Sequence, residues 1–493
     1  MTVQSANTAL PETPSPATPR HSTWADLARD GRLPLTATLV VAIGSHALNG
    51  FLTLTIVPSM VAELGGREVM YWVFALFQIS AIISGTLAGA IKARIGARET
   101  MLVGIGLVAI GSVIAGTAGD LTAVLIGRGL QGVGEGLIIS VSHMLIAASY
   151  PGWLMPRMFS AQSVIWAAAA GFGPLAAGTL TELVSWRAAF LVNLPLAALM
   201  LVQALTAIPA QDRTTARSPG FRPPLLRMAS LAAAVLALCM VGQSREPGLI
   251  ALYITVAVVL LAMMAGLDRR AVARLLPADL FKPASWVRLG FLIAVLTPLG
   301  TMATGVLVPS IAQSVWGFGP TQAGYYGTLL ALSWTTGSLT VVGIANTDTQ
   351  LRIVRLGLFL ITVGMTICAL ALSMPSPWVM AAGIAMIGYG YGTHTLFLDK
   401  FMIASASETE RDRVSGMMPP VDSTGRALGA AFAGFLALSL GLFDGAPVDR
   451  VVAPEAVLAT APQIFIIGAA VVGLAGLTAL RLPNPATIAN ARI

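Results

Sequence analysis

Two ionisable residues, Arg128 and Glu135, lie inside a long apolar stretch at residues 121–149. An ionisable side chain at the centre of a membrane helix costs roughly 2.5 to 3.5 kcal/mol on insertion scales, so such residues usually line a pathway or pair with a partner. Seven residues make about two helical turns, so both side chains point the same way. Glu135 could bind and release a proton as its exposure changes. The alternative is a carboxylate that pairs permanently with a basic or amide side chain.

A second intramembrane carboxyl, Asp422, lies four residues before Arg426 in the apolar stretch at 415–443. Residues four apart share a helix face, so we favour a static local ion pair there, with proton coupling as the alternative. Asp399 and Lys400 are expected at the membrane interface. Arg128, Glu135 and Asp422 are therefore the candidate proton-coupling residues, with Glu135 preferred.

The composition is that of a polytopic membrane protein. Hydrophobic residues make up 56% of the chain, charged residues 10%, and the mean hydropathy is +0.80. The net charge of +7 comes from basic residues in loops, so it indicates orientation and not nucleic-acid binding. Cys239 and Cys368 are isolated, the histidines are scattered, and no phosphate-binding loop is present. We therefore expect no metal, no other cofactor and no ATP-driven step.

Apolar periodicity predicts an all-α integral membrane protein with fourteen spans. We expect them near residues 35–60, 71–91, 101–119, 121–149, 158–182, 188–208, 228–242, 249–267, 289–313, 321–345, 353–374, 378–405, 415–443 and 462–480.

The layout suggests two six-helix bundles, residues 35–208 and 289–481, joined by a linker at 209–288 with two additional central transmembrane helices. We find similar spacing in the two bundles but no clean sequence repeat. Residues 1–34 and 482–493 are expected to be cytoplasmic tails, the first of them disordered.

The distribution of Lys and Arg predicts that both termini are cytoplasmic. With an even number of spans, 23 of the 29 basic residues fall in the tails and the loops on their side. Two lie within spans, and the loops on the other side contain four: Arg67, Arg187, Arg245 and Arg450. This asymmetry follows the positive-inside rule.

Three motifs occur in order in the first bundle. Residues 128–134 read Arg-Gly-Leu-Gln-Gly-Val-Gly, Gly173-Pro174 precedes Gly178 in the next span, and Trp186-Arg187 opens the sixth. Proline bends a helix and glycines allow close packing, so the Gly-Pro segment predicts either a hinge or a plain packing kink. The ordered set resembles the major facilitator superfamily and, more narrowly, its fourteen-span drug/proton antiporter family, over about residues 35–480.

The resemblance implies export by alternating access, and it also exposes two departures. The family usually has an acid in the first span, nine residues before a proline, where this chain has Asn49 before Pro58. An amide cannot take up and release a proton near neutral pH. The loop at 89–98 keeps the remaining conformational residues of the motif but has Ala93 in place of the family's Asp, which weakens a latch. The conformational residues are Gly89, Arg94, Gly96, Arg98, Gly173, Pro174, Gly178 and Arg426.

The resemblance also implies a substrate route between the two bundles. Broad apolar walls with few polar contacts suit amphiphilic organic molecules better than sugars, whose hydroxyls each need a partner. Any one of these side chains could instead serve only packing. The candidate substrate-binding residues are Asn49, Gln78, Gln131, Trp166, Trp334, Tyr389, Tyr391 and His394.

Together these features predict a monomeric secondary transporter of the inner (cytoplasmic) membrane that exports small amphiphilic compounds in exchange for protons. Its partners would be the substrate, protons and the lipid bilayer. Asn49 leaves proton-independent or lipid-directed transport open. A membrane scaffold without transport is a further alternative. An enzyme would need clustered acids and histidines, which this sequence lacks.

Overall fold

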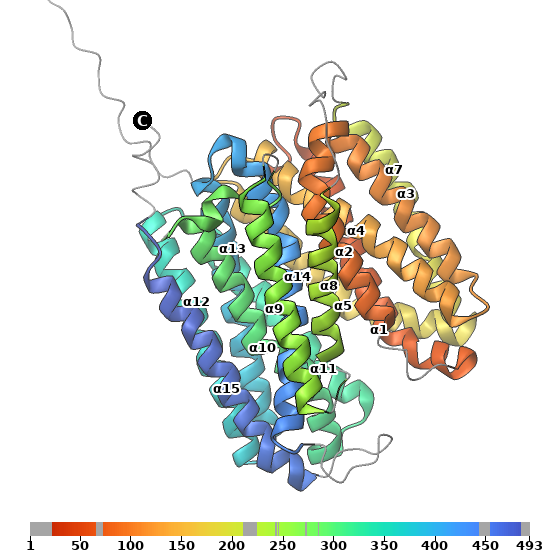
Figure 1. Cartoon of the computed structure of the whole chain (residues 1–493), viewed down its shortest axis with the longest axis vertical. Coiled ribbons are helices and arrows are strands. Elements are labelled where there is room, and N and C mark those ends of the chain that lie inside the picture. Colours follow the sequence, from red (N-terminus) through yellow and green to blue (C-terminus); the bar gives the residue numbers. More distant parts are fainter. Residues whose placement is uncertain are drawn as a thin grey trace, which may run out of the picture.

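The computed structural model describes residues 22–65, 72–210, 224–241, 244, 246–271, 274–283, 285–442 and 454–484. This part of the chain is helical and contains no strand (Figure 1). The long helices are α1 (Leu33–Leu64), α2 (Trp72–Ile95), α3 (Ala97–Gly116), α4 (Leu121–Ser149), α5 (Met155–Leu183), α6 (Trp186–Leu191), α7 (Asn193–Ala207), α8 (Leu225–Val241), α9 (Pro247–Arg269), α10 (Trp286–Trp316), α11 (Pro320–Val341), α12 (Thr347–Ser373), α13 (Pro377–Ser405), α14 (Glu408–Ser439) and α15 (Pro454–Leu480).

Each expected span corresponds to one helix, except that the sixth is divided into α6 and α7 at Val192. Pro195 lies just inside α7, and proline lacks the N–H that would continue the backbone ladder across this junction. Ten helical segments of the described residues are long and apolar enough to cross a membrane, and α8 is a shorter apolar helix. α11, α13 and α14 are not among them. The protein is therefore multi-pass, while the count of fourteen spans stays a prediction.

Residues 22–32, which we predicted to belong to a disordered tail, include the 3-10 helix η1 (Trp24–Leu27). The hydroxyl and the backbone N–H of Thr23 both donate to Oδ2 of Asp26 at 2.7 Å, and these bonds keep the pKa of Asp26 below its usual value. Leu27 is buried in the main apolar core. Residues 1–21 lie outside the described part of the chain.

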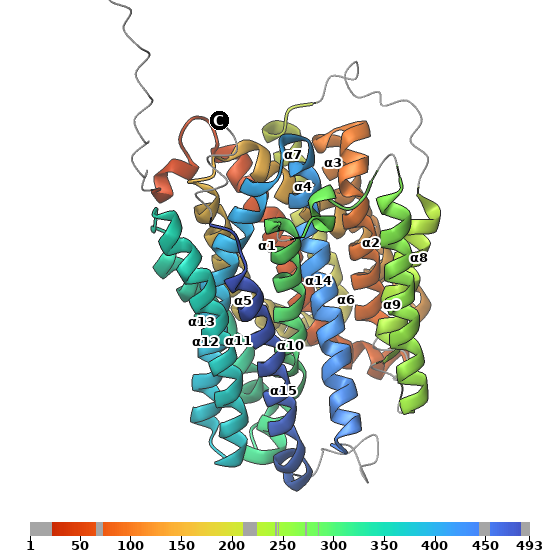
Figure 2. The same ribbon diagram turned by 60° about the vertical axis from the view of Figure 1, so that its left-hand side comes forward.

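The helices form two groups with a hairpin between them. In the first group α1 packs on α5 and α7, and α4 packs on α2 and α3. In the second α10 packs on α14 and α15, and α13 packs on α11 and α12. α8 and α9 pack mainly on each other, and α8 also contacts α2 and α14 (Figure 2). The hairpin therefore touches both groups.

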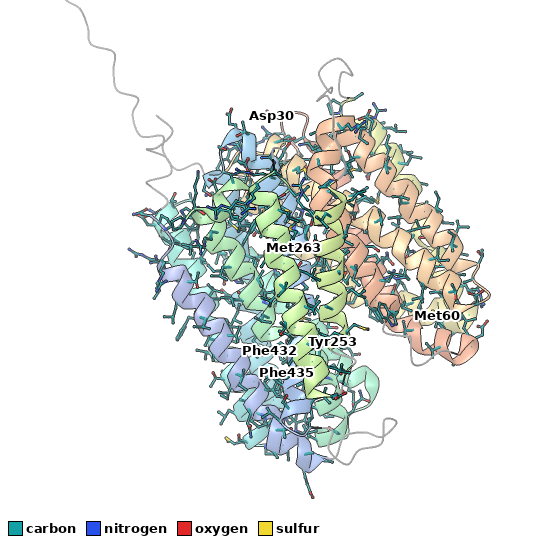
Figure 3. All side chains as sticks on the ribbon, in the orientation of Figure 1. Asp30, Met60, Tyr253, Met263, Phe432 and Phe435 are labelled. Carbon is teal, nitrogen blue, oxygen red and sulfur yellow. The ribbon has the colours of Figure 1, made fainter. Side chains whose placement is uncertain are left out.

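The two groups are closest at the end where the described chain begins and ends, and they diverge toward the opposite end (Figure 1). Figure 3 labels Met60 of α1 and Phe435 of α14 near the diverging ends. At the close end, Nζ of Lys92 on α2 is 2.6 Å from Oδ2 of Asp412 on α14. A Cβ at Gly416 of α14 would collide with Met144 of α4. Small residues therefore let the groups approach there.

At the opposite end, the Trp-Arg pair that opens α6 clamps the first group together. Both side chains donate to the carboxylate of Glu63 at the end of α1, Nε1 of Trp186 at 2.7 Å and Nη1 of Arg187 at 2.7 Å. Arg187 also donates to the backbone carbonyl of Ala118 after α3. The motif therefore joins three helix ends and lies far from any central site.

Candidate functional site

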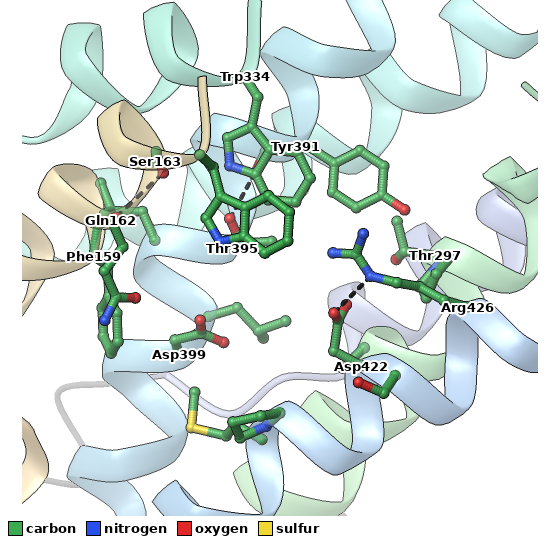
Figure 4. Close-up of a pocket in the computed structure, with 18 of the residues that line it drawn as sticks. Phe159, Gln162, Ser163, Thr297, Trp334, Tyr391, Thr395, Asp399, Asp422 and Arg426 are labelled. Atoms are coloured by element: carbon green, nitrogen blue, oxygen red, sulfur yellow. Dashed lines mark hydrogen bonds and ion pairs between the residues drawn. The ribbon is translucent and has the colours of Figure 1, made fainter. Parts of the chain in front are cut away.

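A cavity of about 400 Å³ lies between the two groups, lined by α1, α4 and α5 on one side and by α10, α11, α13 and α14 on the other (Figure 4). α11, α13 and α14 are the helices that fall outside the set able to cross a membrane by hydropathy.

One wall of the cavity is aromatic. The rings of Trp334 and Tyr391 are stacked with centroids 4.6 Å apart, and the ring of His394 is 5.5 Å from that of Tyr391. The Tyr391 hydroxyl is 2.7 Å from Oγ1 of Thr301, so its polar end is satisfied by α10. Phe159 and Trp166 line the side formed by α5. Flat aromatic surfaces of this kind bind planar or cationic organic groups.

The cavity also contains three charged side chains (Figure 4). Nε of Arg426 is 2.7 Å from Oδ2 of Asp422, and both side chains are about two-fifths exposed. Asp399 lines the same cavity from α13, and no bond or ion pair to it is found among the described residues. Because Asp422 and Arg426 cancel, the net charge of the cavity depends on whether the carboxyl of Asp399 is ionised. We had placed Asp399 at the membrane interface.

The predicted residues divide into two sets. Those that line the cavity are Trp166, Trp334, Tyr391, His394, Asp422 and Arg426. Those that do not line it are Asn49, Gln78, Arg128, Gln131, Glu135 and Tyr389. Tyr389 turns away and its hydroxyl is 2.9 Å from Oγ1 of Thr340. Sequence analysis missed His46, His143, Gln162, Ser163 and Asp399, which all line the cavity.

Arg128 is the centre of a buried polar cluster in the first group. Its guanidinium is 1% exposed and donates to the side-chain oxygens of Asn49 at 3.1 Å and Gln131 at 2.8 Å, and to the backbone carbonyl of Val73 at 3.1 Å. Gln131 in turn donates to Ser112 of α3 at 2.8 Å. Asn49 and Gln131 therefore bind the side chain of Arg128. We predicted that both residues contact substrate, and in this structure their side-chain oxygens contact Arg128. All three direct acceptors are neutral.

Glu135 is also buried, with 1% exposure, two helical turns from Arg128 along α4. Its Oε2 atom is 3.3 Å from Nδ1 of His46 on α1. His46 is about one quarter exposed and lines the cavity. The carboxyl therefore lies behind the cavity wall, and the imidazole stands between the carboxyl and the cavity. No signal in the sequence pairs these residues, because they are far apart in the chain.

The α2–α3 turn contains the predicted conformational residues. Gly96 precedes α3 with φ of +96°, a conformation that favours glycine. Arg94 is exposed and Arg98 is half-buried. Gly89 packs near Met144 of α4. An ion pair to Asp412 of α14 is made by Lys92, the residue before Ala93.

The Gly-Pro segment lies in α5, which is continuous from Met155 to Leu183. A Cβ at Gly173 would be 2.7 Å from Cβ of Phe51, so this glycine permits close packing of α5 on α1. Pro174 is exposed, and a Cβ at Gly178 would meet no atom within 4 Å among the described residues. Gly173 supports the packing interpretation, while the hinge stays a prediction.

Within the described residues no group of three or more His, Cys, Asp or Glu side chains could hold a metal ion. Cys368 is buried in the second group, and the side chain of Cys239 is outside the described part of the chain. The side chains that line the cavity are of types that form ion pairs, stack on aromatic groups and bind protons.

Comparisons with known proteins follow this geometry. A sequence model described as the Major Facilitator Superfamily matches residues 39–273. A probable multidrug-efflux transporter of Mycobacterium tuberculosis strain ATCC 25618 / H37Rv is 25% identical over 415 residues, which cover 82% of this chain and 87% of the relative. A multidrug efflux pump of Staphylococcus aureus strain N315 is 21% identical over 424 residues, covering 85% of this chain and 93% of the pump.

The fold has solved counterparts. The crystal structure of a human organic anion transporter superposes with a TM-score of 0.68 at 14% identity, over 91% of this chain and 99% of that one. At this level of identity the likeness shows the fold alone. The sequence relatives and the human transporter structure are therefore both consistent with the architecture of this chain. Neither comparison specifies which of its side chains act.

Proposed function

The chain belongs to the major facilitator superfamily, and we propose that it is an exporter of small amphiphilic organic compounds, driven by exchange for protons. One observation carries the proposal: the cavity between the two helix groups combines an aromatic wall with a carboxylate that no described residue pairs. The two efflux relatives support the direction of transport.

The charge of the cavity supports monovalent organic cations as substrates. Asp422 and Arg426 neutralise each other at 2.7 Å, which leaves the carboxylate of Asp399 as the net charge. A cation held by Asp399 could also stack on Trp334 and Tyr391, since aromatic faces attract cations.

The arrangement of the helices supports alternating access. With both termini in the cytoplasm, as the distribution of basic residues favours, the Lys92–Asp412 pair closes the cytoplasmic end. The hydroxyls of Ser160 and Ser338, 3.3 Å apart, and the bond from Thr335 to the carbonyl of Ser163 join α5 to α11 on the same side of the cavity. The divergence at the other end then corresponds to an outward-facing state.

Proton exchange would use Glu135. Since the amide of Asn49 stands at the family's acidic position, Arg128 is bonded to neutral groups and requires a counter-charge elsewhere. Glu135, about 10 Å along the same helix, is the nearest carboxyl on α4. One proton that crosses 100 mV and one pH unit releases about 3.7 kcal/mol, which supports between two and three decades of concentration.

The test is transport of ethidium, a monovalent aromatic cation, by the purified full chain in proteoliposomes. An imposed pH gradient should accelerate wild-type ethidium transport, and Glu135→Gln should reduce the gradient-driven rate at least about tenfold. Glu182→Gln is the matched control, because it makes the same change at an exposed position near the end of α5. Gradient-driven transport that survives Glu135→Gln would refute the coupling site.

Asn49 is the specific observation that favours a proton-independent transporter instead. It supplies the acceptor for Arg128 without any titratable group. In that case ethidium would move down its own gradient at the same rate with and without a pH gradient, in wild type and in Glu135→Gln alike.

A further inference from the structure

Glu135 is buried without a hydrogen bond. Neither of its carboxylate oxygens has a hydrogen-bonding partner in the described part of the chain, although the side chain is 1% exposed. A buried carboxylate that accepts no hydrogen bond is costly, whereas a carboxyl that gains a proton loses that cost. The polar atom nearest to it is Nδ1 of His46, 3.3 Å from Oε2, and this nitrogen also lacks another hydrogen-bonding partner.

His46 is held in a fixed place between this carboxyl and the cavity. Its ring is stacked 6.2 Å from that of Phe77 on α2 and meets the edge of Trp166 on α5 at 5.8 Å. These two aromatic rings cover its α2 and α5 sides, so the exposed part of the imidazole faces the cavity. Glu135 therefore has no direct opening, and His46 is its contact with the cavity.

The position of Glu135 on α4 is also fixed. A Cβ at Gly134 would be 2.8 Å from Cγ2 of Val108 on α3, and one at Gly136 would be 2.9 Å from the carbonyl carbon of Ala81 on α2. α4 is therefore locked between α2 and α3, with Glu135 directed toward α1. The other titratable or charged groups around the pair are Arg128 and His143 on α4 and Asp422 on α14.

We propose that His46 and Glu135 form one proton-binding unit, in which Glu135 carries the charge and His46 passes the proton between Glu135 and the cavity. The inference deepens the proposed function and rests on it. In loading, the free ring nitrogen of His46 accepts a proton from a hydronium ion in the cavity, which leaves water. Nδ1 then donates its proton to Oε2 of Glu135. The imidazole ends neutral in its other tautomer, and release reverses both transfers.

The unit explains why Arg128 can have only neutral acceptors. While Glu135 is ionised it balances the fixed charge of Arg128, and loading one proton leaves the core of the first group with one uncompensated positive charge. A change of one in the net buried charge of a helix group shifts the equilibrium between the two conformations of alternating access. Exchange transport requires such a shift. His46 is thus a positioning residue for protons.

The first experiment needs no substrate. Purified full-length protein is treated with diethyl pyrocarbonate, which modifies neutral imidazole, and the extent at His46 and His143 is read by peptide mass spectrometry across pH 5 to 9. The pH profile of His46 modification should differ between wild type and Glu135→Gln, because the variant removes the ionisable neighbour 3.3 Å from Nδ1. The profile of His143, whose Nδ1 contacts only the carbonyl of Ile139, should not change. An unchanged profile for His46 would overturn the inference.

The second experiment measures gradient-driven ethidium transport. His46→Gln should lower the driven rate at least about tenfold and remove its dependence on pH. His143→Gln removes the other imidazole of the first group from the cavity wall and should keep the pH dependence, whatever its rate. If His46→Gln does not fold, wild-type protein is treated with diethyl pyrocarbonate instead. Loss of gradient-driven transport should then parallel the modification of His46 and not that of His143.

The two proposals fail in different ways. If Glu135→Gln loses gradient-driven transport but His46→Gln keeps the wild-type rate and pH profile, the proton route through His46 is wrong and the proposed function stands. If Glu135→Gln keeps gradient-driven transport, the coupling site is wrong and the inference falls with it.

Discussion

α4 and α13 occupy matching places in the two groups and share a pattern of glycines. Glycines 127, 132, 134 and 136 of α4 have the same spacing as glycines 383, 388, 390 and 392 of α13, and α4 has Gly129 in addition. In each group the first and third of these glycines pack on glycines seven residues apart in a neighbouring helix, at 104 and 111 of α3 and at 357 and 364 of α12. The second and fourth face α2 in one group and α11 in the other. The two bundles are thus built on one backbone plan.

The side chains on this shared plan are different. Glu135 and Tyr391 follow the third glycine of each pattern, and each meets the first helix of its group, through His46 on α1 and Thr301 on α10. In the first group this place holds a titratable pair behind the wall, and in the second a hydroxyl pair beside an aromatic surface. The difference is the basis of the division that we propose, in which the first group binds protons and the aromatic surface of the second binds substrate.

The two buried or half-buried arginines offer the largest test of this division. Arg128→Met leaves the oxygens of Asn49, Gln131 and Val73 without their donor, so we expect a loss of about 2 to 4 kcal/mol in the free energy of unfolding. Arg426→Met breaks a half-exposed pair worth under about 1 kcal/mol. Thermal unfolding in detergent, followed by tryptophan fluorescence, measures both. Equal losses of stability would show that the first cluster is no more structural than the second.

Substrate binding should depend on the second group. Asp399→Asn removes the net charge of the cavity, so we expect ethidium affinity to fall about tenfold, equivalent to about 1.4 kcal/mol. Asp422→Asn, which leaves Arg426 without its partner, should weaken ethidium binding as well, since the cavity becomes less negative. Fluorescence titration of the purified protein measures both, and neutral dyes should be affected less. An unchanged affinity in Asp399→Asn would remove the basis for cation selectivity.

The matched pair of positions gives a smaller but sharper test. Tyr391→Phe removes one hydrogen bond to Thr301 and should cost about 1 kcal/mol of stability. Its transport should remain dependent on the pH gradient, in contrast to Glu135→Gln. If Tyr391→Phe abolished gradient dependence as well, both groups would take part in proton coupling and the division would be incorrect.

The smallest effect is expected at the closed end. The Lys92–Asp412 pair is partly exposed, so Lys92→Ala should shift the closed population by no more than about fivefold, equivalent to about 1 kcal/mol. Spin labels near the ends of α2 and α14, in a background without Cys239 and Cys368, report the shift as a change in distance distribution. Exchanging the charges, with Lys92→Asp and Asp412→Lys, should restore the wild-type distribution.

Much of the architecture could be read from local sequence. Apolar runs located every long helix, and the Gly-Pro, Trp-Arg and Gly-rich motifs identified the superfamily, because hydropathy and motif spacing are properties of neighbouring residues. The internal repeat is present in the glycine spacing of α4 and α13, but the residues between these glycines differ. Sequence similarity alone therefore does not reveal it. Only its packing against α3 and α12 reveals that spacing, and not side-chain identity, is what the two bundles share.

The sequence by itself determined which residues are ionisable within apolar stretches, and it marked Arg128, Glu135, Asp422 and Arg426 as unusual. Only the tertiary structure decided their partners. Asn49 became a ligand of Arg128, Asp399 entered the cavity, and His46 came to stand beside Glu135. The physical reason is that the burial and charge of a side chain in a helical bundle depend on the angular position of several helices at once. No single stretch of sequence contains that information.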